Sequence, residues 1–141
     1  WYEKGLTVSS SSTPTTATAT SFLVRLSLET NLATAYSAIG EEQNAIQHYE
    51  EAISIYTNKH QRIDAAQIEL IEEATAITSQ ASFFYGMVLQ GNIREEEGEN
   101  NDNTDTGTGN TAQESIDAYE YAIQLDPNLW AAYANLGSVY Q

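Results

Sequence analysis

The chain has 141 residues, of which 41% are hydrophobic, and its net charge is −15. This apolar content suffices for one packed domain, while the charge argues against nucleic acid or an anionic membrane surface as a partner. The absence of cysteine excludes a disulfide framework and thiolate metal sites. No apolar run approaches the roughly 20 residues that a membrane-spanning helix needs, so we expect no membrane insertion. Because the chain begins at Trp1 without a signal-peptide pattern, we expect a processed product or a fragment.

Two segments have the composition of solvated loops. Residues 9–21, "SSSSTPTTATATS", contain only Ser, Thr, Ala and one Pro, and we interpret them as a linker after the short segment 1–8. Residues 91–111 are acidic and then rich in Asn, Thr and Gly. Neither segment can bury enough apolar surface to offset the entropy of ordering, so each is predicted to be a loop.

The remainder, residues 22–141, has apolar residues three or four apart, which is typical of amphipathic helices. Gly40 supplies a stop after the first of these helices, and Asp126-Pro127 closes the fourth. No Pro or Gly interrupts the third, so a long helix is expected there. The sequence therefore predicts an all-α fold with helices over Phe22–Ile39, Glu41–Tyr56, Arg62–Tyr85, Ala112–Leu125 and Leu129 to the end.

The helical segments repeat one another. "ESIDAYEYAIQLDP" places Ser115, Tyr119, Ala122 and Pro127 at the spacing at which "NAIQHYEEAISIYT" places Ala45, Tyr49, Ala52 and Thr57. Near the end, "YANLGSVY" has the spacing W-x2-L-G-x2-Y with Tyr133, Leu136, Gly137 and Tyr140, where Tyr stands for Trp. These motifs resemble the tetratricopeptide repeat family, whose units are antiparallel helix pairs.

This resemblance implies a helical-repeat array of about two and a half pairs over residues 22–141, with the segment 91–111 inserted as a loop. Tyr2 and Gly5 match the aromatic and small positions of a second helix, so residues 1–8 are interpreted as the remnant of a preceding helix. Many such arrays bind extended peptides in a groove lined by their first helices. The groove candidates implied here are Asn31, Thr34, Phe83, Met87 and Asn135.

No constellation for catalysis or metal binding is found. His48 and His60 lie too far apart for a paired-histidine motif, and paired carboxylates such as Glu72-Glu73 are typical of solvated helix faces. A calcium loop starting at Asp102 would have Gln113 where the bidentate Glu belongs. We therefore expect no enzyme activity, no cofactor and no metal site.

The Ser/Thr-rich segments resemble O-glycosylated, mucin-like sequence, which would give covalent glycans and suit an extracellular or cell-surface location. The alternative is a flexible linker, which leaves a cytoplasmic location open. The candidate acceptors are Ser9, Ser10, Ser11, Ser12, Thr13, Thr15, Thr16, Thr18, Thr20, Thr104, Thr106, Thr108 and Thr111.

The last predicted helix has no polar cap. Leaving Trp130, Leu136 and Tyr140 uncovered forgoes roughly 1.5–3 kcal/mol for each large side chain. We therefore expect a non-catalytic structural or interaction protein that assembles end to end with further copies, into a filament where the contacts do not close. The alternative is a peptide-binding adaptor or scaffold fragment. The candidate assembly interface comprises Trp130, Tyr133, Leu136, Val139, Tyr140, Trp1 and Tyr2.

Overall fold

The computed structural model describes the backbone of residues 2–59, 67–98 and 108–141, and the side chains of residues 20–58, 67–92 and 111–141. These ranges contain helices and short turns and no strand, so the all-α prediction is confirmed. The helices are α1 (Tyr2–Ala38), α2 (Glu42–Lys59), α3 (Ile68–Gly98), α4 (Thr108–Leu125) and α5 (Trp130–Val139).

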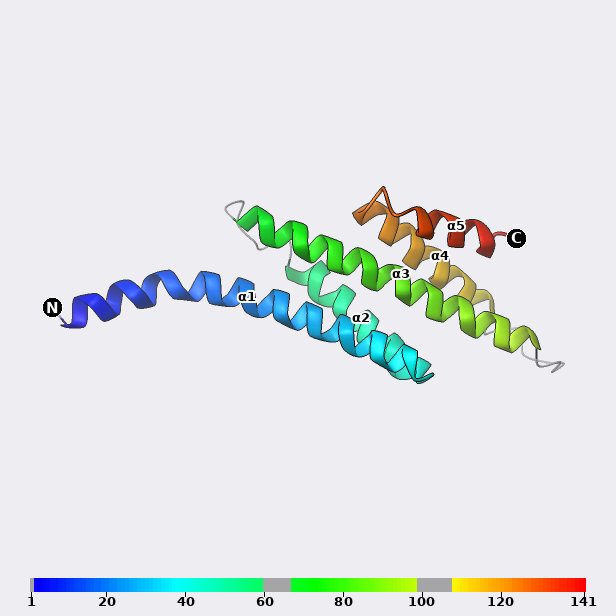
Figure 1. Cartoon of the computed structure of the whole chain (residues 1–141), viewed down its shortest axis with the longest axis horizontal. Helices are drawn as coiled ribbons and strands as arrows, with labels where there is room; N and C mark the ends of the chain where they lie inside the picture. The colour runs from blue at the N-terminus through cyan, green and yellow to red at the C-terminus, as the bar shows by residue number, and fades with distance from the viewer. Residues whose placement is uncertain (1, 60–66, 99–107) are drawn as a thin grey trace.

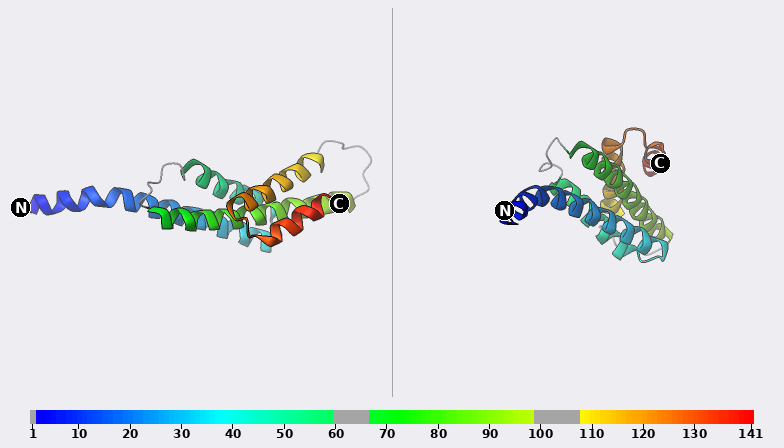
Figure 2. Two further views of the ribbon diagram at one scale, coloured as in Figure 1. Left: turned by 90° about the horizontal axis from the view of Figure 1, so that it is seen from above. Right: turned by 60° about the vertical axis from the view of Figure 1, so that its left-hand side comes forward.

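Each helix packs against the next one along the chain, and α3 also contacts both α1 and α5 (Figure 1). The three helices α1, α3 and α5 therefore follow one another on one side of the array, and α2 and α4 lie on the other side (Figure 2). The N-terminal part of α1 extends beyond the other helices as an arm (Figure 2). At the opposite end of the chain, α5 lies on the outside against α4.

In the core, small residues at the helix contacts alternate with large ones, among them two tyrosines at equivalent positions of α2 and α4. Ala45, Tyr49 and Ala52 of α2 are fully buried. Their counterparts in the repeated sequence of α4 are fully buried as well: Ser115, Tyr119 and Ala122. Alanine and serine allow the helix backbones to approach closely, and each tyrosine ring fills the space that remains.

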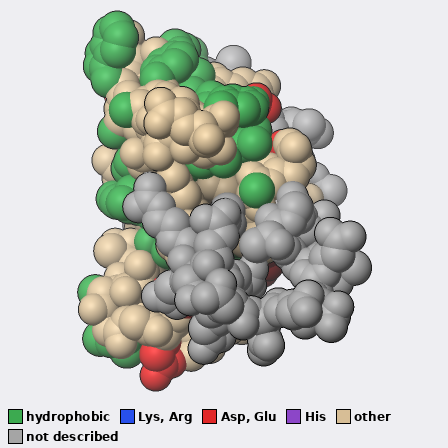
Figure 3. Space-filling model, turned by 90° about the vertical axis from the view of Figure 1, so that its right-hand side faces the viewer, with side chains coloured by type: hydrophobic (Ala, Val, Ile, Leu, Met, Phe, Trp, Pro, Cys, Tyr) green, Lys and Arg blue, Asp and Glu red, His purple; other side chains and the backbone are tan. Residues whose placement is uncertain are grey.

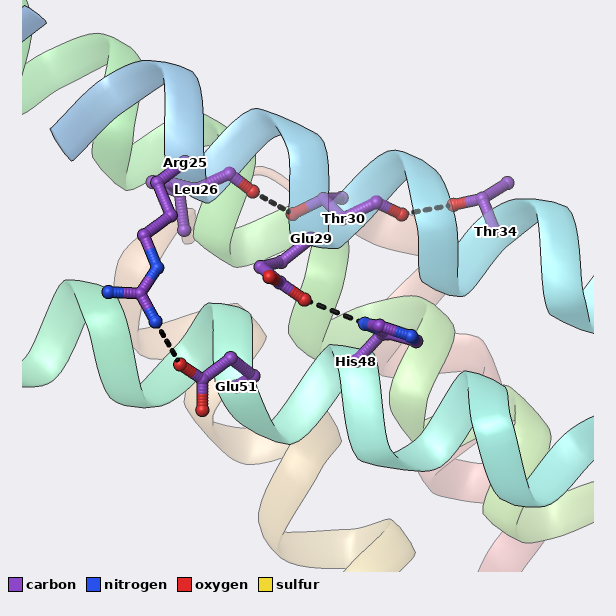
Figure 4. Close-up of polar contacts among 7 residues, drawn as sticks. All are labelled: Arg25, Leu26, Glu29, Thr30, Thr34, His48 and Glu51. Atoms are coloured by element: carbon purple, nitrogen blue, oxygen red, sulfur yellow. Dashed lines mark hydrogen bonds and ion pairs between the residues drawn. The ribbon is translucent and has the colours of Figure 1, made fainter. Parts of the chain in front are cut away.

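Charged and polar pairs join α1 to α2 (Figure 4). Arg25 Nη2 lies 2.7 Å from Glu51 Oε1 on the surface, and His48 Nδ1 lies 2.7 Å from Glu29 Oε2 in a half-buried position. The His48 ring also stacks on Tyr36, with ring centroids 5.3 Å apart. Exposed pairs of this kind contribute at most about 1 kcal/mol each, so they align the helices more than they stabilise them.

Buried serines join α3 to α4. Ser79 donates a hydrogen bond to the carbonyl of Ala122 (2.9 Å), and Ser82 donates one to the carbonyl of Ala118 (2.7 Å). In the opposite direction, Ser115 donates to the carbonyl of Gly86 (3.1 Å). As the residue number rises along α3 it falls along α4, so the two helices are antiparallel.

Two predicted loops are largely helical, so these predictions are wrong over most of their length. The backbone of residues 9–21 lies within α1, α3 continues to Gly98, and α4 already begins at Thr108. Serine and threonine cost only about 0.5 kcal/mol each in a helix, and an isolated glycine about 1 kcal/mol, so these residue types do not exclude a helix. Pro14, in the interior of α1, is the costly residue of this segment at about 3 kcal/mol. Residues 99–107, the centre of the predicted loop, lie outside the described residues.

Some side chains expected in the core face outward. Ala35 and Ile39 of α1 are exposed, as is Phe84 of α3. They continue the apolar spacing, but they lie on sides of their helices that no described helix covers. The start of the predicted third helix, residues 62–66, lies outside the described residues.

Candidate interaction surfaces

The turn before α5 is fixed by Asp126. Its side chain accepts a hydrogen bond from the Asn128 backbone N–H (3.1 Å), and its carbonyl accepts one from the Leu129 N–H (3.1 Å). Pro127 cannot continue α4, so the chain reverses here and α5 begins at Trp130. Ala132 is fully buried, which marks the side of α5 that packs against α4.

Four residues of α5 and its C-terminal end form an apolar surface, which we call the α5 patch: Trp130, Tyr133, Gly137 and Tyr140. The three aromatic side chains are 80%, 45% and 67% exposed in that order. Trp130 and Tyr133 contact each other with ring centroids 6.3 Å apart, and no atom lies within 4 Å of the position that a Gly137 Cβ would occupy. Figure 3, viewed from this end of the molecule, shows hydrophobic side chains gathered at the top of the face. The patch is therefore open.

The other two predicted interface residues of α5 are only half-buried. Leu136 lies between the buried side of the helix and the α5 patch, and Val139, seven residues after Ala132, lies on the buried side. The Tyr133 hydroxyl donates to the Pro127 carbonyl (3.3 Å), so this ring is held across the turn that precedes the helix. From Pro127 to Gln141 the sequence has no Asp, Glu, Lys, Arg or His, and the patch is consequently uncharged in a chain of net charge −15.

The corresponding surface of α3 is covered. Gly86 follows the buried Ala81 by five residues, as Gly137 follows Ala132. A Cβ at Gly86 would lie 2.8 Å from Cε1 of Tyr119, so the tyrosine ring rests directly on the glycine. The Tyr119 hydroxyl donates to Gln90 Oε1 (2.7 Å), which fixes the ring there. In α3 this position therefore accepts an aromatic side chain from the next helix.

At the other end of the array, α1 also exposes apolar side chains. Val24 and Leu28, four residues apart, are both exposed on the same side of α1. The predicted interface residue Tyr2 lies in the helical arm of α1, where only its backbone is described, and Trp1 lies outside the described residues. The predicted part of these two residues in the interface therefore falls on side chains outside the described residues.

The predicted groove residues come from the three helices that follow one another. Asn31 and Thr34 of α1 and Met87 of α3 are exposed, whereas Phe83 and Asn135 are half-buried. Thr34 is engaged within the protein, because its hydroxyl donates to the Thr30 carbonyl (2.9 Å) and lies 3.2 Å from the Tyr49 hydroxyl. Phe83 packs on Phe84 and on Tyr119 with centroid distances of 5.4 and 6.0 Å.

A buried tyrosine of α2 and a half-buried tyrosine of α3 lie side by side near carboxylates. The Tyr85 hydroxyl donates to Glu50 Oε1 (2.8 Å), and its ring lies 6.5 Å from that of Tyr49. Burial, followed by the hydrogen bond to Glu50 and the negative charges of Glu50 and Glu114, raises the pKa of Tyr85 well above its usual value. Burial also raises the pKa of Tyr49, against a smaller opposing effect of the hydrogen bond with Thr34. These groups stay neutral and structural over the physiological range.

The candidate glycosylation sites fall mostly where side chains are not described. Among them, Thr20 is exposed and Thr111 is half-buried. Within the described residues, no three His, Asp or Glu side chains form a group that could hold a metal ion. His48 is engaged with Glu29 and Tyr36, and His60 lies outside the described residues. Nor is any helix in the described ranges long and apolar enough to cross a membrane.

The pockets among the described residues are open hollows at helix seams. One of about 280 Å³ lies between α1 and α2, next to the Arg25–Glu51 pair. Another of about 230 Å³ lies between α2, α3 and α4, beside Tyr85 and Glu114.

Sequence reasoning missed the polar contacts that join α3 to α4. Ser79 and Ser82 are buried, and Gln90, which a groove assignment would leave in solvent, holds the Tyr119 hydroxyl. The available signal is spacing: Ser79, Ser82 and Gly86 are three and four residues apart, so they share one helix face of small side chains.

Comparison of the chain with protein-family models, with curated proteins and with solved structures finds no match.

Proposed function

We propose that this chain is a non-catalytic helical-repeat protein, built of tetratricopeptide-like units, that associates with further copies of itself through its end surfaces. The observation that carries the proposal is the α5 patch. Three large aromatic side chains surround a glycine whose equivalent in α3 is covered by a tyrosine ring. A surface built like an internal helix contact, but left open, favours a function in protein association.

The repeat character is supported by matching burial in the two helix pairs. The small, aromatic and small positions of α2 and α4 are all fully buried, although the two helices share little other sequence. Each helix contacts the next one along the chain, and α3 also contacts α1 and α5, the first helices of the units before and after its own. Both features are expected of stacked antiparallel helix pairs, in which each unit contacts only its neighbours.

Energetic reasoning favours coverage of the patch. Burying a large apolar side chain contributes roughly 1.5–3 kcal/mol, so covering Trp130 and Tyr140 alone offsets a good part of the entropy lost on association. The charge of the chain opposes close approach of two copies. Since the patch itself is uncharged, this repulsion acts from a distance and is screened by salt.

Sedimentation velocity over a concentration series tests the proposal. We expect the average sedimentation coefficient to rise with concentration, and to rise at lower concentration when salt is added. A chain that stays monomeric up to the order of 1 mM, where even weak specific contacts are populated, would contradict it. Val24→Glu and Tyr140→Glu variants, one for each end, then show which end takes part.

A second function, peptide binding on the surface of α1, α3 and α5, is favoured by the exposed side chains of Phe84 and Met87. Extended peptides with apolar side chains are the expected ligands, because no described Lys or Arg lies beside these residues to hold a carboxylate. Fluorescence anisotropy with such peptides, compared between the parent chain and Met87→Glu, tests it. Equal binding by both proteins would exclude this surface.

We further propose that the Ser/Thr residues of the arm carry O-linked glycans and that the protein works at a cell surface or outside the cell. The exposed position of Thr20 and the extension of the arm away from the other helices support access by a modifying enzyme. Intact-mass measurement on native material is the test, and an unmodified mass would contradict it.

A further inference from the structure

The four residues of the α5 patch are spaced symmetrically. From Trp130 to Tyr133 is three residues, from Tyr133 to Gly137 four, and from Gly137 to Tyr140 three. The order of side chains is aromatic, aromatic, glycine, aromatic. Read from either end, the spacing is the same about position 135. A surface with this property can match a second copy of itself that runs in the opposite direction.

In such an antiparallel pair, residues at equal distances on either side of position 135 lie opposite each other. Trp130 of one copy then faces Tyr140 of the other, and Tyr133 faces Gly137, with each pairing made twice. The glycine accepts a tyrosine ring because it has no side chain, and the outer positions pair aromatic with aromatic. No other side chain of the patch is left without an opposite.

The α3–α4 contact shows that this chain already makes that pairing. There the Tyr119 ring rests on Gly86 between two antiparallel helices. The hydrogen bonds of Ser79 with Ala122 and of Ser115 with Gly86 fix the antiparallel direction. A tyrosine over a glycine between antiparallel helices is therefore a contact that the packing of this fold accommodates.

We propose that the α5 patch binds the α5 patch of a second copy, forming a two-fold symmetric, antiparallel helix pair. This inference deepens the proposed function, on which it rests, by naming the end surface and the symmetry of the contact. An uncharged patch admits a second copy of net charge −15, which an acidic patch would repel. One helix pair buries less than the roughly 1,200 Å² of a stable interface, so the dimer is expected to be weak.

The rival occupant within the same proposed function is the α1 surface of another copy, around Val24 and Leu28. A contact from the α5 patch to α1 joins different surfaces, so every copy keeps a free end and the series grows beyond two. A contact between two α5 patches occupies the patch of both copies, so assembly ends at a dimer. The number of copies in the assembly therefore separates the two arrangements.

Sedimentation equilibrium on the complete chain tests the inference, with Gly137→Glu compared against Ala131→Glu. Both variants add one negative charge to α5; Gly137 has open space for a side chain, and Ala131 is exposed outside the patch. We expect a monomer–dimer equilibrium for the parent chain and for Ala131→Glu. In Gly137→Glu we expect the dissociation constant to rise at least about tenfold, as for a central contact residue.

Disulfide formation tests the antiparallel register, since the chain has no cysteine of its own. When Trp130→Cys and Tyr140→Cys copies are mixed under mild oxidation, a mixed disulfide is expected to form faster than either disulfide between identical copies. In the mixed dimer the two cysteines are opposite and one native Trp–Tyr pairing is kept. In a dimer of identical copies the cysteines are about 15 Å apart along the helices.

The outcomes discriminate between the two proposals. A series that grows beyond the dimer, or a dimer indifferent to Gly137→Glu, contradicts the α5–α5 contact while leaving end-to-end association standing. A monomer at every concentration contradicts both. A dimer that Gly137→Glu weakens and Ala131→Glu does not, with preferential mixed disulfides, supports both.

Discussion

The α3 and α5 helices each carry a buried alanine followed five residues later by a glycine, yet the glycine of one is enclosed and that of the other is open. In α3, Gly86 lies under the ring of Tyr119, and the serines of this face bond to α4. In α5, Gly137 has no neighbour at its side-chain position, and Trp130, Tyr133 and Tyr140 are exposed. The difference is that α3 has helices on two sides, while α5 is packed on the side of α4.

The two helical glycines therefore have different structural roles in this chain. At Gly86 the missing side chain is required by a ring that is already present. At Gly137 it leaves a space that an incoming side chain can fill. The change in the free energy of unfolding caused by a substitution should therefore differ in sign or in size between an enclosed and an open position. Unfolding is best measured at high dilution, where the protein is monomeric.

The largest difference is expected for the tyrosines. Tyr119→Ala removes a fully buried ring and leaves a cavity, so the free energy of unfolding should fall by about 3–5 kcal/mol. Tyr133→Ala removes a half-exposed ring and should lower it by less than about 1 kcal/mol. Urea unfolding followed by circular dichroism measures both, and equal losses would contradict the contrast between the two helices.

A smaller difference of opposite sign is expected for the glycines. Gly86→Ala places a methyl group against the Tyr119 ring, which is buried and held by Gln90, and should cost about 1–3 kcal/mol. Gly137→Ala meets no atom and should raise the stability by about 0.5–1 kcal/mol through helix propensity. The direction in which the midpoint of thermal unfolding shifts gives the sign of each change in stability. A Gly86→Ala variant that is more stable than the parent would contradict the close contact between Gly86 and the Tyr119 ring.

A change of about 1 kcal/mol is expected for a buried serine. Ser82→Ala removes the hydrogen bond to the Ala118 carbonyl and should lower the free energy of unfolding by about that amount. Its control is Ser138→Ala in α5, where the hydroxyl is exposed and the change should be under about 0.5 kcal/mol. Denaturant unfolding of the two variants would show no difference if the serines merely fill space.

The dependence of stability on alkaline pH concerns Tyr49 and Tyr85. Both have a folded-state pKa above the ordinary 10.0, so the folded state binds more protons than the unfolded state above that pH. Their contribution is fully present below pH 10.0 and is lost as the pH rises toward the folded-state values. Tyr85→Phe should make the fall in stability above that pH shallower, and an unchanged slope would contradict this origin.

The helical class and the repeated burial pattern could be predicted from the sequence, because apolar spacing and the Ala–Tyr–Ala positions depend on local periodicity. The repeated motif places Tyr49 and Tyr119 at equivalent positions, and both are buried. The extent of the helices could not be predicted at the Ser/Thr-rich residues 9–21. There composition favours a loop, and the continuity of α1 prevails.

The candidate surface could be predicted only in part. The amphipathic pattern predicts that aromatic residues of α5 are uncovered. The open space at Gly137 cannot be predicted in this way, because it depends on which helices lie next to α5. The same alanine-to-glycine spacing occurs at the enclosed Gly86, so this spacing by itself does not separate a covered from an uncovered face. Likewise, Ile39 continues the apolar spacing of α1 and is nevertheless exposed, because no described helix lies against it.

The most direct test of the central claim is the fluorescence of Trp130 as a function of protein concentration. Trp1→Phe removes the other tryptophan, so the emission reports on the α5 patch alone. We predict that the emission maximum is that of a water-exposed indole at high dilution and shifts to shorter wavelength as concentration rises. The shift should be absent when Gly137→Glu is added. An emission maximum that stays at the exposed value up to the highest soluble concentration would contradict the claim that this face is an interface.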